Sequence, residues 1–232
     1  MNIPKDARNC RRARAVTKRA TRGPQGFTLL ELLMVVALVA IFTVEIGVAL
    51  RRPDESVALQ SAQATGCSLL NAVRGRAAIA QQNARLVIAA DPADSENLLR
   101  FLQVVEQDSS DPANWLAQVD GIRLPAGVYV VPPAPAAVPG NPAWPSSRRS
   151  TGLPSSAQSM MINGAASGAC YYVQFTPRGT TGGGYLLLTV GHFTAGDSGP
   201  VLSLDSADNL RGMLVRSSGA ITVLNDASAF SP

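Results

Sequence analysis

An apolar run of 24 residues near the N-terminus, residues 27–50, constrains this chain more than any other feature. Its only charged residues are two glutamates, Glu31 and Glu45, and it contains no proline. An α-helix rises about 1.5 Å per residue, so the run reaches about 36 Å and is long enough to cross a hydrocarbon core of about 30 Å. The sequence therefore predicts a transmembrane helix over residues 27–52, which ends at a pair of arginines.

Charge is distributed unevenly on the two sides of this run. The leader, residues 1–26, holds eight lysines and arginines against one aspartate, whereas the rest of the chain holds 12 basic and 15 acidic residues. A basic segment beside a membrane helix stays in the cytoplasm, so we expect a single-pass protein whose larger part lies across the membrane. Basic leaders also occur in nucleic-acid-binding proteins. The position against a membrane helix disfavours that reading here, and no Lys or Arg follows Leu224 to form a basic tail.

Glu31 lies about one helical turn inside the apolar run, where an ionised carboxylate costs about 3 kcal/mol even by lenient insertion scales. A charged residue in such surroundings normally has a partner. Cleavage of the chain after Gly26 would create one, because the new α-amino group of Phe27 would stand four residues before Glu31.

The residues around that bond read Gly26-Phe27-Thr28-Leu29-Leu30-Glu31, between a basic leader and an apolar helix. This pattern resembles the class III signal of type IV pilins and type II secretion pseudopilins. The resemblance implies that a prepilin peptidase cleaves after Gly26 and N-methylates Phe27, and that Glu31 serves assembly. It also implies a bacterial inner-membrane protein whose N-terminal helix contacts membrane lipid and other pilin-like subunits, with its C-terminal head in the periplasm.

Two other kinds of N-terminal segment fit these residues less well. An ordinary secretory signal has an apolar core of about 7–15 residues and is cut after it, whereas this run is longer and the expected cut precedes it. The helix could also be the uncleaved anchor of a binding protein that does not assemble, but this reading leaves Glu31 unexplained. Dependence on the prepilin peptidase separates such an anchored protein from a pilin-like subunit. Glu45 is expected either to reach water at the outer face of the membrane that the helix spans or to pair with Arg51 or Arg52.

Residues 53–232 are expected to form one head domain. Pro53 predicts a bend or a brief break, and an amphipathic helix is expected over about residues 54–84, because apolar residues recur there at helical spacings. Its expected apolar stripe comprises Val57, Ala64, Cys67, Leu70, Val73, Ala77 and Ala80. Aromatic residues make up only 5% of the chain, so the core should be aliphatic.

A β-region is expected over about residues 85–224. Predicted strands lie at residues 85–89, 98–105, 115–119, 128–131, 170–175, 185–190, 211–216 and 220–224. Residues 132–158 are rich in proline, glycine and serine and predict a long surface loop, disordered or carrying a contact surface. Residues 191–210 are also expected to form a loop, and the polar tail 225–232 to fray.

Two short motifs are similar to the GspH/FimT type of minor pseudopilin. One is the helix end VRGRAAIA at residues 73–80, and the other combines FTPRG at residues 175–179 with VRSSG at residues 215–219. The resemblance implies an α+β, pilin-like fold, in which one long N-terminal helix packs its second half on an antiparallel β-sheet. It implies a structural subunit of a type II secretion pseudopilus, with a minor type IV pilin for adhesion or DNA uptake as the alternative.

Of the three cysteines, Cys10 belongs to the leader, while Cys67 and Cys170 lie in the part expected in the oxidising periplasm. A disulfide between Cys67 and Cys170 would tie the helix to the sheet and stabilise the fold by about 4–5 kcal/mol through the long closed loop. Two buried free thiols are the alternative.

No enzymatic activity is expected. Residues 196–200 read GDSGP, as in chymotrypsin-like proteases, but that mechanism needs a histidine base positioned by a carboxylate. The single histidine, His192, lies only six residues before Ser198. No Cys/His cluster suits zinc, and no Asp-rich loop has the calcium-binding pattern, so neither a cofactor nor a metal is expected.

Overall fold

The computed structural model describes residues 29–134, 144–145, 147–196 and 199–230, without the side chains of residues 40–54, 196, 199–200, 227 and 229. The predicted leader, with Cys10, and the expected cleavage site Gly26–Phe27 lie outside the described residues. The chain divides into two compact units, Met1–Gly47 and Val48–Pro232. The first contains the start of helix α1, and the second contains the rest of this helix and every strand.

Helix α1 spans Leu29–Ala80, 52 residues, and continues through Pro53. The break expected at this proline is wrong: a proline removes one backbone hydrogen bond, and the turns on both sides keep the chain helical. The helix ends before the predicted end at residue 84, because Gln81 adopts a left-handed conformation with a φ of 53°. The Gln81 side chain donates to the carbonyl oxygen of Ala78 at 2.6 Å and satisfies one carbonyl of the last turn.

The first sheet has strand β1 (Ala84–Ala89) between β2 (Phe101–Gln107) and β8 (Cys170–Phe175). Its order is β7-β6-β3-β2-β1-β8, with β3 at Asn114–Ala117, β6 at Met161–Ile162, β7 at Ala165–Ala166, and β4 (Ile122–Arg123) paired with β2. Every pair is antiparallel except β3 with β6. The predicted strand at residues 170–175 has the same bounds as β8.

The second sheet has the order β10-β9-β11-β12, and β5 (Val128–Val130) also pairs with β9. Its long strand β9 spans Gly184–Gly196 and is followed by β10 (Gly199–Leu204), β11 (Leu210–Val215) and β12 (Ile221–Leu224). All its pairs are antiparallel. The hairpin of β11 and β12 forms where it was predicted.

The loop expected over residues 191–210 is wrong, because β9 continues to Gly196 and pairs with β10. Leu202 and Leu204 of β10 are buried in the main core, and Phe193 of β9 packs edge-on against Tyr129 with ring centroids 6.0 Å apart. These long-range contacts stabilise a hairpin whose polar and glycine-containing sequence has no clear strand pattern.

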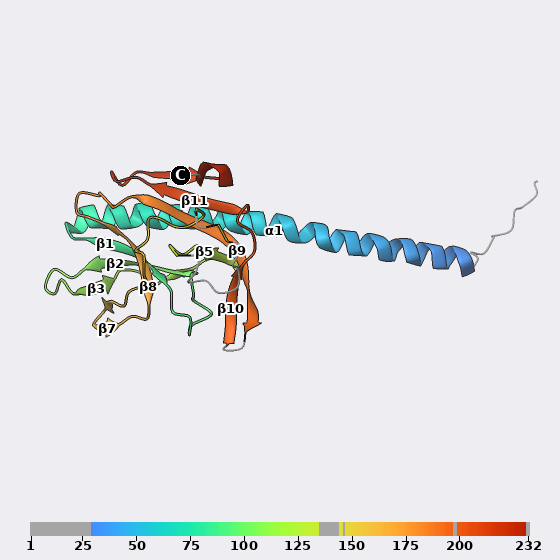
Figure 1. Ribbon diagram of the computed structural model, residues 1–232, viewed down its shortest axis with the longest axis horizontal. Coiled ribbons are helices and arrows are strands. Elements are labelled where there is room, and N and C mark those ends of the chain that lie inside the picture. Colours follow the sequence, from blue (N-terminus) through green and yellow to red (C-terminus); the bar gives the residue numbers. More distant parts are fainter. Residues whose placement is uncertain (1–28, 135–143, 146, 197–198, 231–232) are drawn as a thin grey trace, which may run out of the picture. The chain divides into compact units, whose positions relative to one another are not determined.

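The main core lies where residues 59–77 of α1 meet strands of both sheets (Figure 1). This is the expected α+β, pilin-like architecture of a long helix packed on antiparallel strands, with two sheets in place of one. The predicted stripe is correct for Leu70, Val73 and Ala77, which are fully buried. It is wrong for Val57, which is 63% exposed, and for the exposed Ala64 and Ala80, whereas Leu59, Ala62 and Leu69 are buried instead.

Part of the expected surface loop 132–158 is built into the fold; residues 135–143 and 146 lie outside the described residues. The Ser150 hydroxyl is fully buried and accepts a hydrogen bond from the Leu187 backbone N–H at 2.9 Å. Gly152 donates to the carbonyl oxygen of Tyr185 at 3.0 Å. Residues 150–152 thus line the edge of β9, and contacts from distant residues order a segment that has no apolar pattern.

The tail is also ordered as far as the structure describes it. Residues Ala227–Phe230 form a 3₁₀ helix, and Phe230 is only 3% exposed. Its ring packs edge-on against Tyr185 at a centroid distance of 6.0 Å. The Phe230 ring lies over Gly212, because a Cβ added to this glycine would be 3.0 Å from Cε1 of the ring. The prediction of a frayed tail is therefore wrong for Phe230.

Candidate functional site

The first described turns of α1 expose apolar side chains in every direction. The large apolar residues that are at least 50% exposed here are Leu29, Leu30, Leu32, Leu33, Met34, Val35, Val36, Leu38 and Val39. A helix that is hydrophobic all round normally lies in a core or a membrane. This segment is therefore built for apolar surroundings that the single chain does not supply.

Glu31 is the acidic residue of the first turn of this segment and is exposed among leucines. A carboxylate in the first turn interacts favourably with the helix dipole. The residues predicted to be cleaved and methylated, Gly26 and Phe27, lie outside the described residues, and so does the side chain of Glu45. Their roles stay predictions.

The predicted transmembrane helix extends beyond what the structure describes, because Phe27, Thr28 and the side chains of residues 40–54 are outside it. Among the described residues, no helix is both long enough and apolar enough to cross a membrane.

Of the two alternatives for Cys67 and Cys170, a disulfide or two free thiols, the structure has the free thiols. Cys67 packs against the main core, whereas Cys170 belongs to a second, small cluster that also contains Val87, Val105 and Trp115. Burial raises the pKa of both thiols, and a hydrogen bond with Ser167 offsets this only in part for Cys170. Both thiols are therefore poor nucleophiles at neutral pH.

His192 has a carboxylate partner that the sequence reasoning missed: its Nδ1 lies 2.6 Å from Oδ1 of Asp205. No sequence signal links two residues that only the turn of a hairpin brings together. His192 lies opposite Ser203 in the pairing of β9 with β10, and Gly196 pairs with Gly199 at the other end of this hairpin. The contact between His192 and Asp205 therefore lies on this hairpin, and Ser198 lies outside the described residues.

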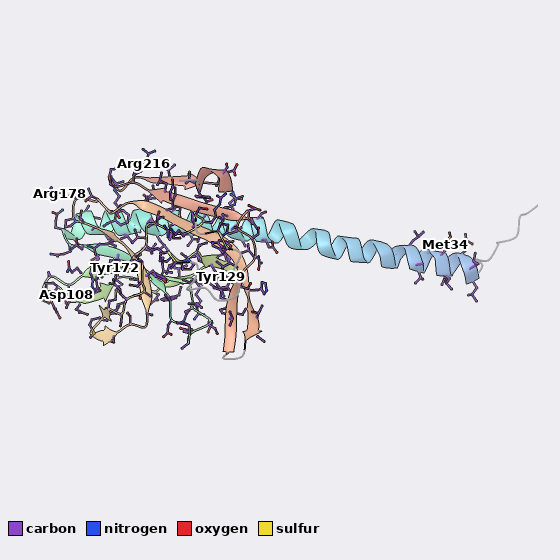
Figure 2. All side chains as sticks on the ribbon, in the orientation of Figure 1. Met34, Asp108, Tyr129, Tyr172, Arg178 and Arg216 are labelled. Carbon is purple, nitrogen blue, oxygen red and sulfur yellow. The ribbon has the colours of Figure 1, made fainter. Side chains whose placement is uncertain are left out.

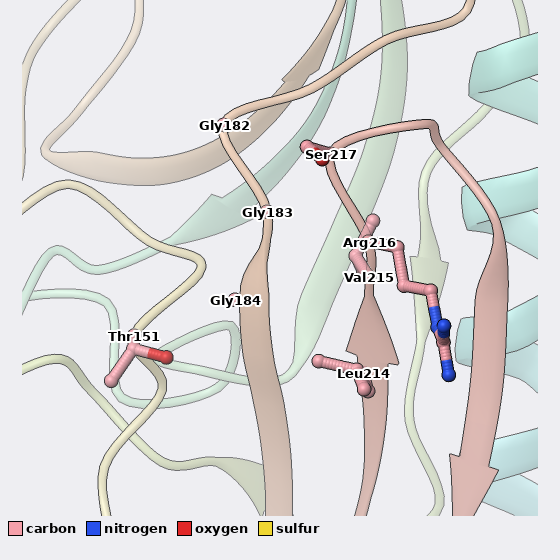
Figure 3. Close-up of a pocket in the computed structure, with 8 residues that line it drawn as sticks. All are labelled: Thr151, Gly182, Gly183, Gly184, Leu214, Val215, Arg216 and Ser217. Atoms are coloured by element: carbon pink, nitrogen blue, oxygen red, sulfur yellow. The ribbon is translucent and has the colours of Figure 1, made fainter.

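A shallow depression of about 690 Å³ opens on the second sheet (Figure 3). It is lined by Thr151, Gly182, Gly183, Gly184, Leu214, Val215, Arg216 and Ser217. Figure 3 shows the Arg216 side chain directed away from the three glycines, and the Thr151 hydroxyl already accepts the Tyr185 N–H at 3.0 Å. The depression thus reflects missing side chains at the glycines and does not define a ligand.

Comparison with known proteins bears on the N-terminal segment first. Residues 21–44 match the family model described as the prokaryotic N-terminal methylation motif, and this range includes Gly26, Phe27 and Glu31. Among solved structures, the minor pseudopilin EpsH from the type 2 secretion system of Vibrio cholerae is similar to 72% of this chain and 96% of that chain, with 12% identity and a TM-score of 0.39. A search of curated proteins found no significant match.

The matched residues 21–44 include the first described turns of α1, and the second half of this helix packs on antiparallel strands of both sheets. The chain therefore carries, over residues 21–44, the N-terminal methylation motif of prokaryotes.

Proposed function

We propose that this chain is a minor pseudopilin, a structural and not an enzymatic subunit of a type II secretion pseudopilus. It is made as a single-pass precursor in the inner membrane, with its basic leader in the cytoplasm and its head in the periplasm. A prepilin peptidase cleaves after Gly26 and methylates the new N-terminus, Phe27. The methylation motif at residues 21–44 and the GspH/FimT-like motifs of the head support this proposal.

The observation that carries the proposal is the exposed apolar surface at the start of α1. Nine large apolar side chains between Leu29 and Val39 are at least half exposed, and each such side chain gains about 1.5–3 kcal/mol when it is fully buried. Lipid first and the helices of neighbouring subunits later supply the apolar surroundings. The same surface in a soluble, unassembled protein would cause aggregation.

Glu31 then directs the assembly. In a bundle of apolar helices its carboxylate pairs with the methylated amine of Phe27 on a neighbouring subunit, because an uncompensated charge in such surroundings is most costly. Only one stagger between subunits brings the two charges together, so the pair selects the correct register.

Replacement of Glu31 tests this role. We expect Glu31→Leu to insert into the membrane as the unaltered protein does but to lose incorporation into filaments by about 100-fold, which corresponds to a lost buried pair of about 3 kcal/mol. Glu31→Asp, which keeps the charge, is the matched control and should retain part of the incorporation into filaments. Unchanged incorporation of Glu31→Leu would refute the proposed pairing.

A minor type IV pilin would use the same helix and the same glutamate. The two systems are separated by purification of the assembled filament from the native host, followed by identification of the subunits that accompany this chain. Subunits of the secretion machinery support the proposal, and subunits of a surface pilus replace it by the alternative.

A further inference from the structure

A two-residue turn joins strands β6 and β7 and consists of an asparagine followed by a glycine. Asn163 and Gly164 connect Ile162 to Ala165, which pair across the hairpin, and both turn residues have positive φ, 51° and 78°. These values are those of a type I′ turn, which asparagine and glycine adopt most readily. Asn163 is the only asparagine of the chain that precedes a glycine.

The bond between these two residues is open to a known reaction of asparagine. The Gly164 backbone nitrogen, after losing its proton to hydroxide, attacks Cγ of the Asn163 side chain. A C–N bond forms, and the amide nitrogen takes a proton from water and leaves as ammonia, which gives a five-membered succinimide. Water then opens the ring at either carbonyl and yields aspartate or isoaspartate, without oxidation or reduction. Both residues are exposed, and nothing lies within 4 Å of the Cβ position of Gly164 to hinder the attack.

The folded hairpin keeps the two reacting groups apart. The nucleophilic N–H of Gly164 donates to Oδ1 of Asn114 at 3.0 Å. The Asn163 side chain is directed to β3, where its Oδ1 accepts the Ala117 N–H at 2.9 Å. In a type I′ turn the Cβ of the first central residue lies on the far side of its Cα–C bond from the next nitrogen. The succinimide ring requires both on the same side, so the turn must open before the ring can form.

Asn114 is held in place by the fold and not by the hairpin alone. Its Nδ2 donates to Oδ2 of Asp108 at 3.4 Å, and its backbone carbonyl oxygen accepts the Asp108 N–H at 3.0 Å. Figure 2 shows Asp108 at the end of the head where β3 lies. Because a carboxylate accepts and an N–H donates, one orientation of the Asn114 amide suits both partners. A neutral amide oxygen is no base, so Asn114 retains the proton on Gly164 and does not remove it.

The hairpin also covers a buried thiol. Met160 and Ile162 pack against the small cluster that contains Cys170, which is only 2% exposed. The Cys170 thiol donates to the carbonyl oxygen of Gln158 at 3.0 Å, just before the hairpin. Isoaspartate would lengthen the backbone of the turn by a methylene group. Because the length of a turn fixes the register of its strands, the hairpin could not close again over Cys170 in the same register.

From this arrangement we infer that Asn163 is a site of spontaneous deamidation, that Asn114 keeps it closed in the folded head, and that its conversion uncovers Cys170. Water is the co-reactant. A chain in which the hairpin has opened for long enough thus acquires a permanent negative charge at residue 163, and the change marks that chain irreversibly.

Peptide mapping of the full-length protein by mass spectrometry tests the site. The protein is kept in detergent and mildly alkaline buffer, either folded or in urea, and aspartate and isoaspartate at residue 163 are quantified over time. In urea, Asn163 should convert faster than every other asparagine. In the folded protein its conversion should be at least about 10-fold slower, because it requires local opening. Equal rates in the folded and unfolded protein would overturn the inference.

Asn114→Ala tests the protecting contact. Loss of the acceptor should speed conversion of Asn163 in the folded protein about 2- to 10-fold, the change that one neutral hydrogen bond gives. Asn71→Ala is the matched control, because the Asn71 amide donates within α1 to the carbonyl oxygen of Cys67 at 3.0 Å, and it should leave the rate unchanged. Equal rates in the two variants would refute the role of Asn114. If Asn114→Ala does not fold, the comparison of the folded and unfolded unaltered protein decides.

Chains that carry isoaspartate at residue 163 provide a second readout, after separation by their added negative charge. Cys170 should be alkylated about 10-fold faster in them than in unmodified chains. Cys67, which packs against the main core, should react at an unchanged rate and serves as the internal control. Unchanged labelling of Cys170, or equal acceleration at both cysteines, would contradict the uncovering of Cys170 by the hairpin. Processing of the N-terminus does not enter this experiment, so its result is independent of the proposed function.

Discussion

The side-chain amide of Gln63 on α1 donates to the backbone carbonyl oxygen of Gly212 on β11 at 2.8 Å, and also to Leu224 on β12 at 2.9 Å. Gln63 is only 3% exposed. Because Gly212 and Leu224 are partners across the final hairpin, one glutamine attaches this hairpin to the helix. A buried amide is stable here only because both of its donor hydrogens are used.

Gln63→Leu should therefore destabilise the head. The leucine fills the same space but donates nothing to the two carbonyls, and we expect a loss of about 1–3 kcal/mol in the free energy of unfolding. Gln60→Leu, on the exposed face of the same helix, should change stability by less than about 0.5 kcal/mol. Denaturant unfolding of the full chain in detergent measures both, and equal effects would contradict the role of Gln63.

Two glycines of α1 predict opposite responses. A Cβ on Gly66 would lie 3.0 Å from both Sδ and Cε of Met213, whereas nothing lies within 4 Å of the corresponding position on Gly75. Gly75→Ala should stabilise the head by about 0.5–1 kcal/mol through helix propensity. Gly66→Val should destabilise it by about 1–3 kcal/mol through overpacking. Thermal unfolding that moves in the same direction for both would contradict the packing.

Arg85 is held between two aromatic rings on the outer face of the first sheet. Its guanidinium carbon lies 3.9 Å from the Trp115 ring centroid and 4.0 Å from that of Tyr172, and its Nε donates to Gln174 at 2.8 Å. Arg85→Ala should cost about 1–2 kcal/mol. Arg85→Lys keeps the charge but not the planar stack, so it should recover only part of the loss. Full recovery by lysine in unfolding experiments would contradict the stacking.

The free thiols predict slow chemistry with alkylating reagents. Burial raises the pKa of Cys67 and Cys170, so less thiolate is present at neutral pH, and the folded protein should react much more slowly than the protein in denaturant. The pKa of each thiol is higher in the folded than in the unfolded protein, so keeping the thiols protonated favours the folded state. This stabilisation is complete at neutral pH and is lost as the pH rises through the pKa of the folded protein. Rapid labelling of both cysteines, or their quantitative oxidation to a disulfide with each other, would contradict the structure.

The sequence predicted those parts of the fold that depend on local pattern. Residues 170–175 alternate and form β8, and the glycine turn at residues 217–219 joins β11 to β12. It could not predict parts stabilised by distant partners. Ser150 is ordered by Leu187, 37 residues away, and Phe230 is ordered by Tyr185. The predicted apolar stripe of α1 is wrong at its start, because the buried face of the helix there includes a polar residue, Gln63.

The candidate site is predictable for a different reason. A glycine, a phenylalanine and a glutamate at fixed spacing before an apolar run form a local signal, and residues 21–44 match the corresponding family model. No such signal links Arg74 to the two turns that it contacts. Arg74, Arg178 and Arg216 are 104 and 38 residues apart along the chain, and only the packing of α1 against two turns brings them together.

The most direct measurement is mass spectrometry of the N-terminus of the protein extracted from the membranes of a host that has a prepilin peptidase. The account predicts that the mature chain begins with N-methylated phenylalanine at residue 27 and lacks the basic residues that precede it. A chain that still begins at Met1, or that begins elsewhere, would contradict the assignment of Glu31 to the new N-terminal amine and with it the proposed subunit of a pseudopilus.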